Sequence, residues 1–296
     1  MAKSRQLKGR IRSVQNTRKI TKTMELVATS KLKRAQDRVI AARPYAEALR
    51  QVIADLYTPD LADRFPLLRQ PAPPAKGGPS RAAVILLTSN RGLAGGFNSN
   101  LIKEARRRIE SLERDGYTVE LLGIGKKGIG FFKYLGRKLA LERIDIGDRP
   151  TTDHAAEIVE PLIQAFSAGE LASVDLIQAR FLSALQTPPA TIRILPVEEV
   201  GQQGDAAGQL KNYILVPNAE AILERLLPLY VRNALYRGMV ETAAAEHGAR
   251  RTAMKNATDN AGDILELLKR TYNRQRQAQI TQEIAEIVGG AAALQG

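Results

Sequence analysis

An α/β fold with a long helical coiled coil is predicted, in which a Rossmann-like α/β domain is inserted between two terminal helices paired antiparallel. Residues 3–57 and 219–288 carry apolar side chains at helical spacing, in a stripe as thin as a coiled-coil seam. The segment between them alternates short apolar runs with helical patterns. Helices of this length would measure about 80 Å and 105 Å, whereas a compact globule of such a chain is roughly 50 Å across. We therefore expect the helices to pair with each other.

The expected domain boundaries are 1–70 for the first coiled-coil helix, 80–205 for the α/β domain and 210–296 for the last helix. A Pro-rich linker separates the first two at Pro71–Pro79. Asn218 is a plausible N-cap of the last helix, and Pro228 should kink it. The apolar residues expected to line the seam are Leu7, Ile11, Val14, Ile20, Met24, Val27, Leu32, Ala35 and Val39, with Ile222, Leu226, Leu229, Ile264, Leu267, Leu268, Ile280, Ile284 and Ile287.

Within the α/β domain, strands are expected at 82–88, 117–122, 174–180 and 191–195. Helices are expected at 100–114, 129–135 and 152–168. Strands that alternate with helices favour parallel pairing.

The amino-acid composition excludes several classes of function and indicates the kind of partner. Cysteine is absent, which excludes disulfides, thiol catalysis and cysteine-ligated zinc. There is no signal peptide pattern and no run of about 18 apolar residues. The net charge is +13, and such a balance indicates nucleic acid, an acidic membrane face or an acidic protein as partner. Much of it comes from Lys3, Arg5, Lys8, Arg10, Arg12, Arg18, Lys19, Lys22, Lys31, Lys33, Arg34 and Arg38.

Two glycine-rich turns could bind phosphate groups. Gly123–Gly128 matches G-x-G-x-x-G after a predicted strand, with Glu142 or Asp145 placed for a ribose contact. Its alternative is a tight turn without a cofactor. Residues 90–97 could cradle a phosphate at a helix start, or form a strand-to-helix turn packed on a neighbour. No G-x-x-x-x-G-K-[ST] motif occurs, which excludes nucleotide hydrolysis by that route.

Three further features have two interpretations each. His154 and His247 lack partners at ligand spacing, so we expect solvated surface histidines and no metal site. The basic first helix could bind nucleic acid, but an aromatic content of 5% favours an acidic protein surface instead. The uncharged stretch after Glu286 is either a frayed tail or a tip that a partner encloses.

Long motifs at both ends resemble the gamma-subunit family of F-type ATP synthases, of the bacterial type. Residues 10–28 read Arg-Ile-Arg-Ser-Val-Gln-Asn-Thr-Arg-Lys-Ile-Thr-Lys-Thr-Met-Glu-Leu-Val-Ala. Residues 280–293 read Ile-Thr-Gln-Glu-Ile-Ala-Glu-Ile-Val-Gly-Gly-Ala-Ala-Ala, and residues 91–98, 253–261 and 272–278 are also similar to the family. The chloroplast insert with its cysteine pair is missing, and Gly248 stands where the family usually has Ala.

The resemblance implies a central rotor shaft without catalytic activity, cofactor or metal. Its partners would be the alpha and beta subunits, the epsilon subunit and the c ring, with no nucleic acid. It would lie peripherally at the cytoplasmic face of the cell membrane, attached only through the complex. The alternatives are an NAD-binding enzyme and a basic nucleic-acid-binding protein.

The resemblance also implies partner-binding residues. Arg276, Gln277 and Thr281 match positions that hydrogen-bond to a beta subunit, and Met24 matches a position beside that contact. Ile284 and Ile287 belong to the enclosed apolar end of the last helix. Tyr213 matches the foot near the c ring and epsilon. The alternative for each is an ordinary coiled-coil position.

Overall fold

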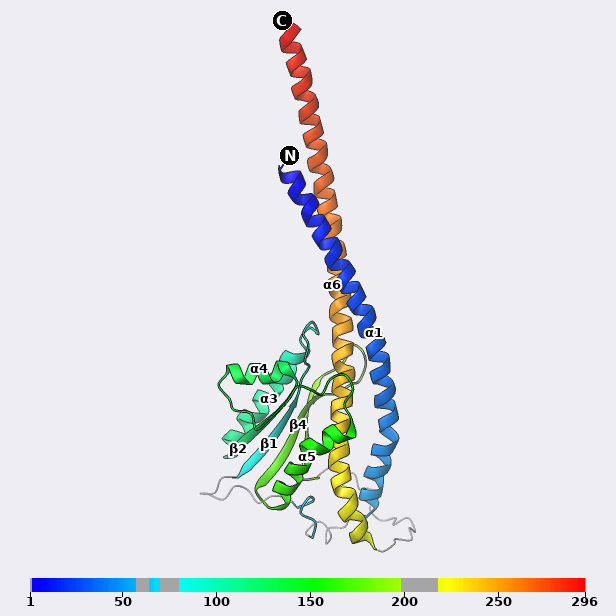
Figure 1. Ribbon diagram of the computed structural model, residues 1–296, viewed down its shortest axis with the longest axis vertical. Coiled ribbons are helices and arrows are strands. Elements are labelled where there is room, and N and C mark those ends of the chain that lie inside the picture. Colours follow the sequence, from blue (N-terminus) through cyan, green and yellow to red (C-terminus); the bar gives the residue numbers. More distant parts are fainter. Residues whose placement is uncertain (1, 57–63, 70–79, 198–217, 296) are drawn as a thin grey trace. The chain divides into compact units, whose positions relative to one another are not determined.

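The computed structural model describes residues 2–56, 64–69, 80–197 and 218–295. The chain divides into two compact units, residues 1–28 with 251–296 (the terminal unit) and residues 29–250 (the central unit). The helices are α1 (Ala2–Leu56), α3 (Phe97–Arg114), α4 (Lys126–Tyr134), α5 (Thr152–Ser167) and α6 (Ala219–Gln295), and the strands are β1 (Arg81–Leu87), β2 (Thr118–Ile124), β3 (Leu141–Arg143), β4 (Leu171–Ala179) and β5 (Pro189–Leu195). The predicted fold class is confirmed (Figure 1).

The central unit contains one five-stranded sheet in the order β3-β2-β1-β4-β5. β1 pairs in parallel with β2 and β4, and β2 pairs in parallel with β3, as expected from the alternating pattern. β5 instead pairs antiparallel with β4. The reason is the short connection between them, which permits a hairpin but not the crossover that a parallel pair requires. The three-residue β3 was not predicted, because so short a strand has no measurable period.

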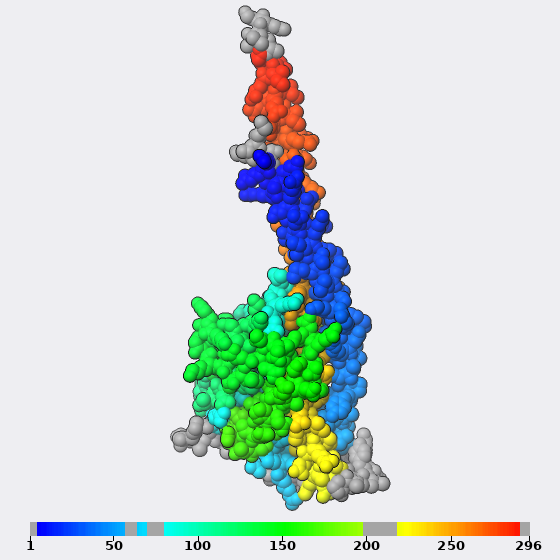
Figure 2. All heavy atoms as spheres, in the orientation of Figure 1, coloured from blue at the N-terminus to red at the C-terminus, as the bar shows by residue number. Residues whose placement is uncertain are grey.

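Both faces of the sheet are covered. Along β1, Ala83, Ile85 and Leu87 point into one apolar cluster, which also contains residues of α1, α5 and α6. The alternate side chains Val84 and Leu86 point into the other cluster with α3 and α4. This two-residue alternation is what a strand buried on both faces requires. In Figure 2 the green region, which includes α4 and α5, forms a continuous surface on the visible face of the central unit.

α6 approaches the sheet closely because two of its residues are glycines. A Cβ atom at Gly238 would lie 2.2 Å from Gln178 Oε1, on β4. A Cβ at Gly248 would lie 3.2 Å from the carbonyl oxygen of Ala184, in the β4–β5 hairpin. Gly248, which weakens the helix in isolation, therefore makes room for a neighbouring segment.

A buried carboxylate joins three elements of the central unit. Asp175 on β4 is 1% exposed. It accepts hydrogen bonds from Arg108 of α3, at 2.9 Å from Nε, and from Arg193 of β5, at 3.3 Å from Nε. Because both partners are charged, these bonds are stronger than neutral ones and fix α3 against the β4–β5 edge.

The terminal helices begin and continue as the sequence indicates. Asn218 accepts a hydrogen bond from the Ala221 N–H at 2.8 Å, so the predicted N-cap is confirmed. α6 continues through Pro228, and α1 through Pro44, without an interruption of the helix. Among the described helices, none combines the length and the apolar character that a membrane crossing needs. The predicted linker Pro71–Pro79 lies outside the described residues.

In the terminal unit, α1 and α6 pair through small and polar residues. Thr21, Ala28, Thr258 and Ala261 are buried there, with Met254 and Leu265. The buried positions of α6 follow one another at spacings of four, three and four, the pattern of a coiled-coil seam. The Thr21 and Thr258 hydroxyl oxygens lie 2.8 Å apart and join the two helices. In Figure 1, α6 continues beyond the N-terminal end of α1.

Several residues predicted for the seam lie on the outside instead. Ile20, Val27, Ile264 and Leu267 are 60%, 51%, 49% and 65% exposed. These four residues lie between the seam positions of the heptad, on helix faces that point away from the partner helix. Other predicted seam residues of the terminal unit, Leu7, Ile11, Val14, Met24 and Leu268, are partly buried, so the prediction is confirmed in part, and the threonines of the seam were missed.

Candidate interaction surfaces

The predicted partner-binding residues near the end of α6 are exposed. Gln277, Thr281 and Ile284 follow one another at spacings of four and three and so share one helix face. Ile284 and Ile287 are 56% and 70% exposed, and Arg276 lies on the adjoining face. The Thr281 hydroxyl donates to the Gln277 carbonyl at 3.0 Å, which holds it close to the helix. All five side chains point to solvent within the terminal unit.

The structure does not bring Met24 next to this face. The Thr21–Thr258 contact sets the register of the antiparallel pair, so Met24 lies level with about residue 255. Arg276 lies about 30 Å further along α6. Met24 itself is half-buried beside the seam. Tyr213, the other predicted contact, lies outside the described residues.

Charge is distributed unequally over the terminal unit. Residues 1–28 contain eight Lys and Arg and a single acid, Glu25. From 277 onward α6 has no basic residue, and its two carboxylates accept hydrogen bonds from Gln279 and Gln282, each at 2.9 Å. A basic segment and a nearly uncharged end therefore present two different surfaces to partners.

The turn at Gly123–Gly128 is explained by packing. A Cβ at Gly125 would lie 2.0 Å from the Thr88 carbonyl oxygen, and one at Gly128 would lie 2.9 Å from the Thr88 hydroxyl. The first N–H groups of α4 are already bonded: Lys126 donates to the Asn90 side chain at 3.0 Å, and Gly128 to the Thr88 hydroxyl at 3.0 Å. These are the groups that would hold a pyrophosphate in a dinucleotide site. The geometry thus favours the tight-turn interpretation.

The second glycine-rich turn, residues 90–97, also packs on its neighbours. Its Gly92 carbonyl accepts two hydrogen bonds from Arg250 of α6, at 3.3 Å and 3.4 Å. Phe97 is buried in the core, and Ser89 and Asn98 bond each other across the base of the turn at 2.9 Å. This is the strand-to-helix turn that was the alternative to a phosphate cradle.

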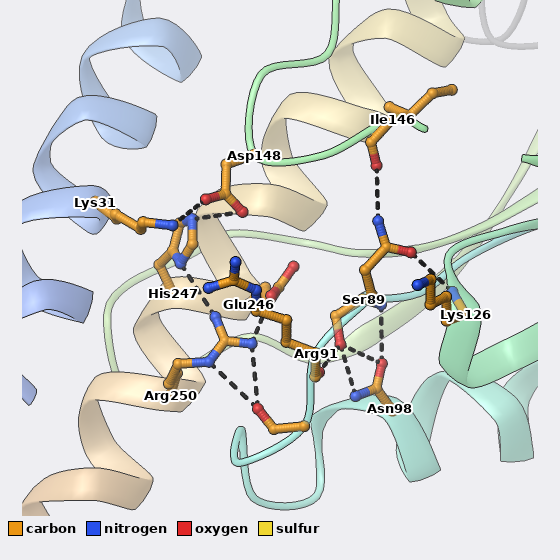
Figure 3. A network of polar contacts seen from close by, with 12 residues as sticks. Lys31, Ser89, Arg91, Asn98, Lys126, Ile146, Asp148, Glu246, His247 and Arg250 are labelled. Atoms are coloured by element: carbon orange, nitrogen blue, oxygen red, sulfur yellow. Dashed lines mark hydrogen bonds and ion pairs between the residues drawn. The ribbon is translucent and has the colours of Figure 1, made fainter. Parts of the chain in front are cut away.

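A network of charged side chains joins α1, α6 and the loop after β3 in the central unit (Figure 3). Asp148, in that loop, accepts a hydrogen bond from Lys31 and lies 3.6 Å from His247 Nε2. Its carbonyl oxygen accepts a bond from Arg38 at 2.8 Å. Arg250 donates to Glu246 at 2.6 Å and lies 3.3 Å from His247 Nδ1. This network was not predicted from the sequence, because its members are far apart in the chain.

His247 corrects one prediction, since it is 2% exposed and is not a solvated surface histidine. Burial lowers its pKa to about 4, against the opposing charge of Asp148 and with the help of Arg250 and Lys31. Arginine can only donate, so Nδ1 must accept, and the proton of the neutral ring is on Nε2, which faces Asp148. His154 instead lies at the start of α5, where its backbone N–H donates to Thr151 in a capping box.

The two carboxylates of the network, Asp148 and Glu246, have pKa values shifted in opposite directions. Partial burial would raise the pKa of Asp148, but the hydrogen bond from Lys31 and the nearby positive charges lower it overall. Burial raises the pKa of Glu246 in spite of its bond to Arg250. Both effects follow from how far each carboxylate is removed from water and how closely a cation approaches it.

Ligand atoms of Asp148, Glu246 and His247 lie within 4.8 Å of one another, close enough for a metal ion. The surroundings do not fit one. Lys31 and Arg250 already neutralise the carboxylates, and a divalent cation would add to a positive cluster. The ring nitrogen nearest Asp148 also carries the proton. The arrangement is an ion-pair network.

A cleft of about 320 Å³ adjoins the network at the carboxyl ends of β1 and β2. Its lining mixes apolar side chains such as Ile124 and Met239 with Arg91 and Lys126 at the rim and Asp148 and Glu246 beside them. Such edges are where ligands bind in open α/β sheets. Here the lining contains both positively and negatively charged side chains, so it does not define a class of ligand.

A family model described as ATP synthase matches residues 3–294. An ATP synthase gamma chain from Gemmatimonas aurantiaca is 60% identical over the full length of both chains. One from Leptospira biflexa is 41% identical over 99% of this chain and all of its own length. A chain in a cryo-EM structure of the Euglena gracilis mitochondrial ATP synthase (OSCP/F1/c-ring) is similar with a TM-score of 0.70, at 19% identity, over 99% of this chain and 95% of that one.

The fold is therefore one that occurs in ATP synthase assemblies. The chain belongs to the ATP synthase gamma-chain family.

Proposed function

We propose that this chain is the central rotor shaft of a proton-translocating F-type ATP synthase. It couples rotation of the membrane c ring to sequential conformational changes of the catalytic beta subunits. Its partners are the alpha and beta subunits of the head, the epsilon subunit and the c ring. Family membership over residues 3–294 supports this assignment.

One structural observation carries the proposal: many large apolar side chains of the terminal unit are exposed. Leu26, Leu267 and Ile287 are 60%, 65% and 70% exposed, outside the seam that buries Met254 and Leu265 with alanines and threonines. An apolar surface of this kind indicates a binding partner. A sleeve of surrounding subunits would cover it on all sides, as a shaft requires.

The shaft acts through asymmetry. A single shaft within a threefold ring presents a different face to each beta subunit at any moment. Each beta subunit is thereby biased toward a conformation with a different nucleotide affinity, and rotation exchanges these states in sequence. The chain itself is non-catalytic, because the nucleotide chemistry takes place in the partners.

The contact residues remain part of this proposal. Arg276, Gln277 and Thr281 would hydrogen-bond to a beta subunit, and Ile284 and Ile287 would contact an apolar sleeve. Met24 would contact the ring of alpha and beta subunits at a separate level of the shaft, because it lies far from Arg276 along the helix pair. Tyr213 would lie in the foot, near the c ring and epsilon.

Two further proposals concern organisation and location. The segments 1–70, 80–205 and 210–296 would act as first shaft helix, α/β foot and second shaft helix. The chain would be associated with the cytoplasmic face of the cell membrane only through the complex.

The test uses the assembled complex with Arg276→Ala, and Arg274→Ala as matched control on the same exposed stretch of α6. We expect Arg276→Ala to lower ATP-driven proton pumping relative to ATP hydrolysis, and Arg274→Ala to leave that ratio near wild type. Proton pumping by vesicles and phosphate release are measured side by side. ATP hydrolysis by the purified chain alone, or its failure to copurify with alpha and beta subunits, would contradict the proposal.

A further inference from the structure

We propose that Asp148 is the central residue of a torque-bearing latch, through which the α/β layers of the central unit hold α1 and α6 against rotation. The inference rests on the proposed rotor function. Asp148, Lys31 and Arg38 then have a positioning role: they transmit load to the helices through contacts within this chain.

One residue reaches both helices. The Asp148 side chain accepts a hydrogen bond from Lys31 of α1 and faces His247 of α6, and its carbonyl accepts from Arg38. Lys31 and Arg38 are seven residues apart and so lie two turns apart on one face of α1. The loop after β3 therefore contacts α1 at two levels and α6 at one.

The apolar contacts at the same level are poorly suited to resist rotation. Ala35 and Val39 of α1 pack against Val240 and Ala244 of α6. The buried side chains between the helices are alanines and valines, with Phe181 and Tyr236 packed against them. Apolar burial is non-directional, so it opposes separation of the helices better than it opposes sliding. A hydrogen bond between charged groups weakens steeply as its distance and angle change, and so resists a tangential displacement.

A second link holds α6 from another loop. Arg250 donates to the Gly92 carbonyl of the β1–α3 turn, and its orientation is fixed by Glu246 and by the neutral ring of His247. Because the loops after β1 and β3 both belong to the α/β layers, α6 is held at two separate points.

Folding stability alone does not account for the Lys31–Asp148 pair. Its side chains are 33% and 40% exposed. Ion pairs accessible to solvent contribute little to stability. An ion pair that contributes little to folding stability but has a directional hydrogen bond suits a positioning role. Because its contribution is small, variants at these positions should still fold.

The test measures the torsional stiffness of the rotor in the assembled complex. The head is immobilised, a probe is attached to the c ring, and thermal angular fluctuations are recorded without ATP. We expect Asp148→Asn to increase the angular variance, which is a loss of stiffness. Asp145→Asn is the matched control, because Asp145 lies in the same loop but pairs with Arg143 at 2.8 Å and is outside the latch.

A covalent link provides the rescue that a merely structural role would not show. The chain has no native cysteine, so Lys31→Cys with Asp148→Cys gives it a single reactive pair. Bridging the pair with a bismaleimide should restore the wild-type variance, whereas blocking each thiol separately should not.

The outcomes separate the two proposals. If the wild-type chain forms no rotating complex, the rotor function itself fails. If it does, and assembled Asp148→Asn complexes keep the wild-type variance, the latch is wrong and the rotor function stands. Should Asp148→Asn not assemble, the same measurement is made on Lys31→Met, which leaves the loop unchanged and removes only the charge on α1. An increased angular variance supports the latch, and a wild-type variance contradicts it.

Discussion

The central and terminal units differ in how fully they bury their large apolar side chains. In the central unit, Ile85, Leu176 and Leu227 are at most 1% exposed, within layers that cover both faces of a sheet. In the terminal unit, Leu267 and Ile287 are on the surface, and the contact between the helices includes a pair of threonines. The first arrangement completes its core within the chain, whereas the second leaves apolar surface for other subunits to cover.

The largest expected effect concerns the buried charge of the central unit. Replacing Asp175 by Ala leaves Arg108 and Arg193 without their common partner, and we expect a loss of about 3–5 kcal/mol in the free energy of unfolding. Urea unfolding of the full-length chain measures it. Asp145→Ala, which removes an exposed carboxylate, should cost no more than about 1 kcal/mol. Equal losses for the two variants would show that burial does not set the stability of this unit.

A smaller effect should appear with pH. The folded pKa of His247 is about 4 and its reference value is 6.5, so the unfolded chain takes up a proton first as the pH falls. Its contribution to stability is therefore present above pH 6.5 and is lost between about 6.5 and 4, by up to about 3 kcal/mol. Asp148, with a lowered pKa, acts in the same direction, and Glu246, with a raised pKa, acts against it.

The measurement is the free energy of unfolding of the full-length chain across this pH range. His247→Gln should flatten the curve, and His154→Gln should leave its slope as in wild type. Parallel curves for His247→Gln and wild type would mean that the buried ring does not cause the pH dependence.

Sequence patterns predicted the central unit better than the terminal one. The β1 strand and the helix after it were predicted because residues such as Val84 and Leu86 are apolar for a local reason, burial on a sheet face. The terminal seam was predicted only in part: Leu7, Ile11, Val14 and Leu268 are partly buried at seam spacing. Ile264 and Leu267 were wrongly included, because they are apolar for a reason outside the chain, contact with other subunits in the proposed assembly. The Asp148 network could not be predicted, because nothing local distinguishes a surface histidine from one that three distant segments enclose.

The smallest effect offers the sharpest comparison, since it uses two leucines of one helix. Leu265 is 5% exposed in the seam and Leu267 is 65% exposed. In the isolated chain, Leu265→Ala should lower the stability of the terminal unit by about 2 kcal/mol, and Leu267→Ala should change it by no more than about 0.5 kcal/mol. Helix content followed by circular dichroism during urea unfolding measures both.

In the assembled complex Leu267→Ala should instead weaken retention of the chain, because its side chain then contacts a partner. A Leu267→Ala chain that is as destabilised in isolation as Leu265→Ala would place Leu267 in an internal core and remove the contrast between the two units.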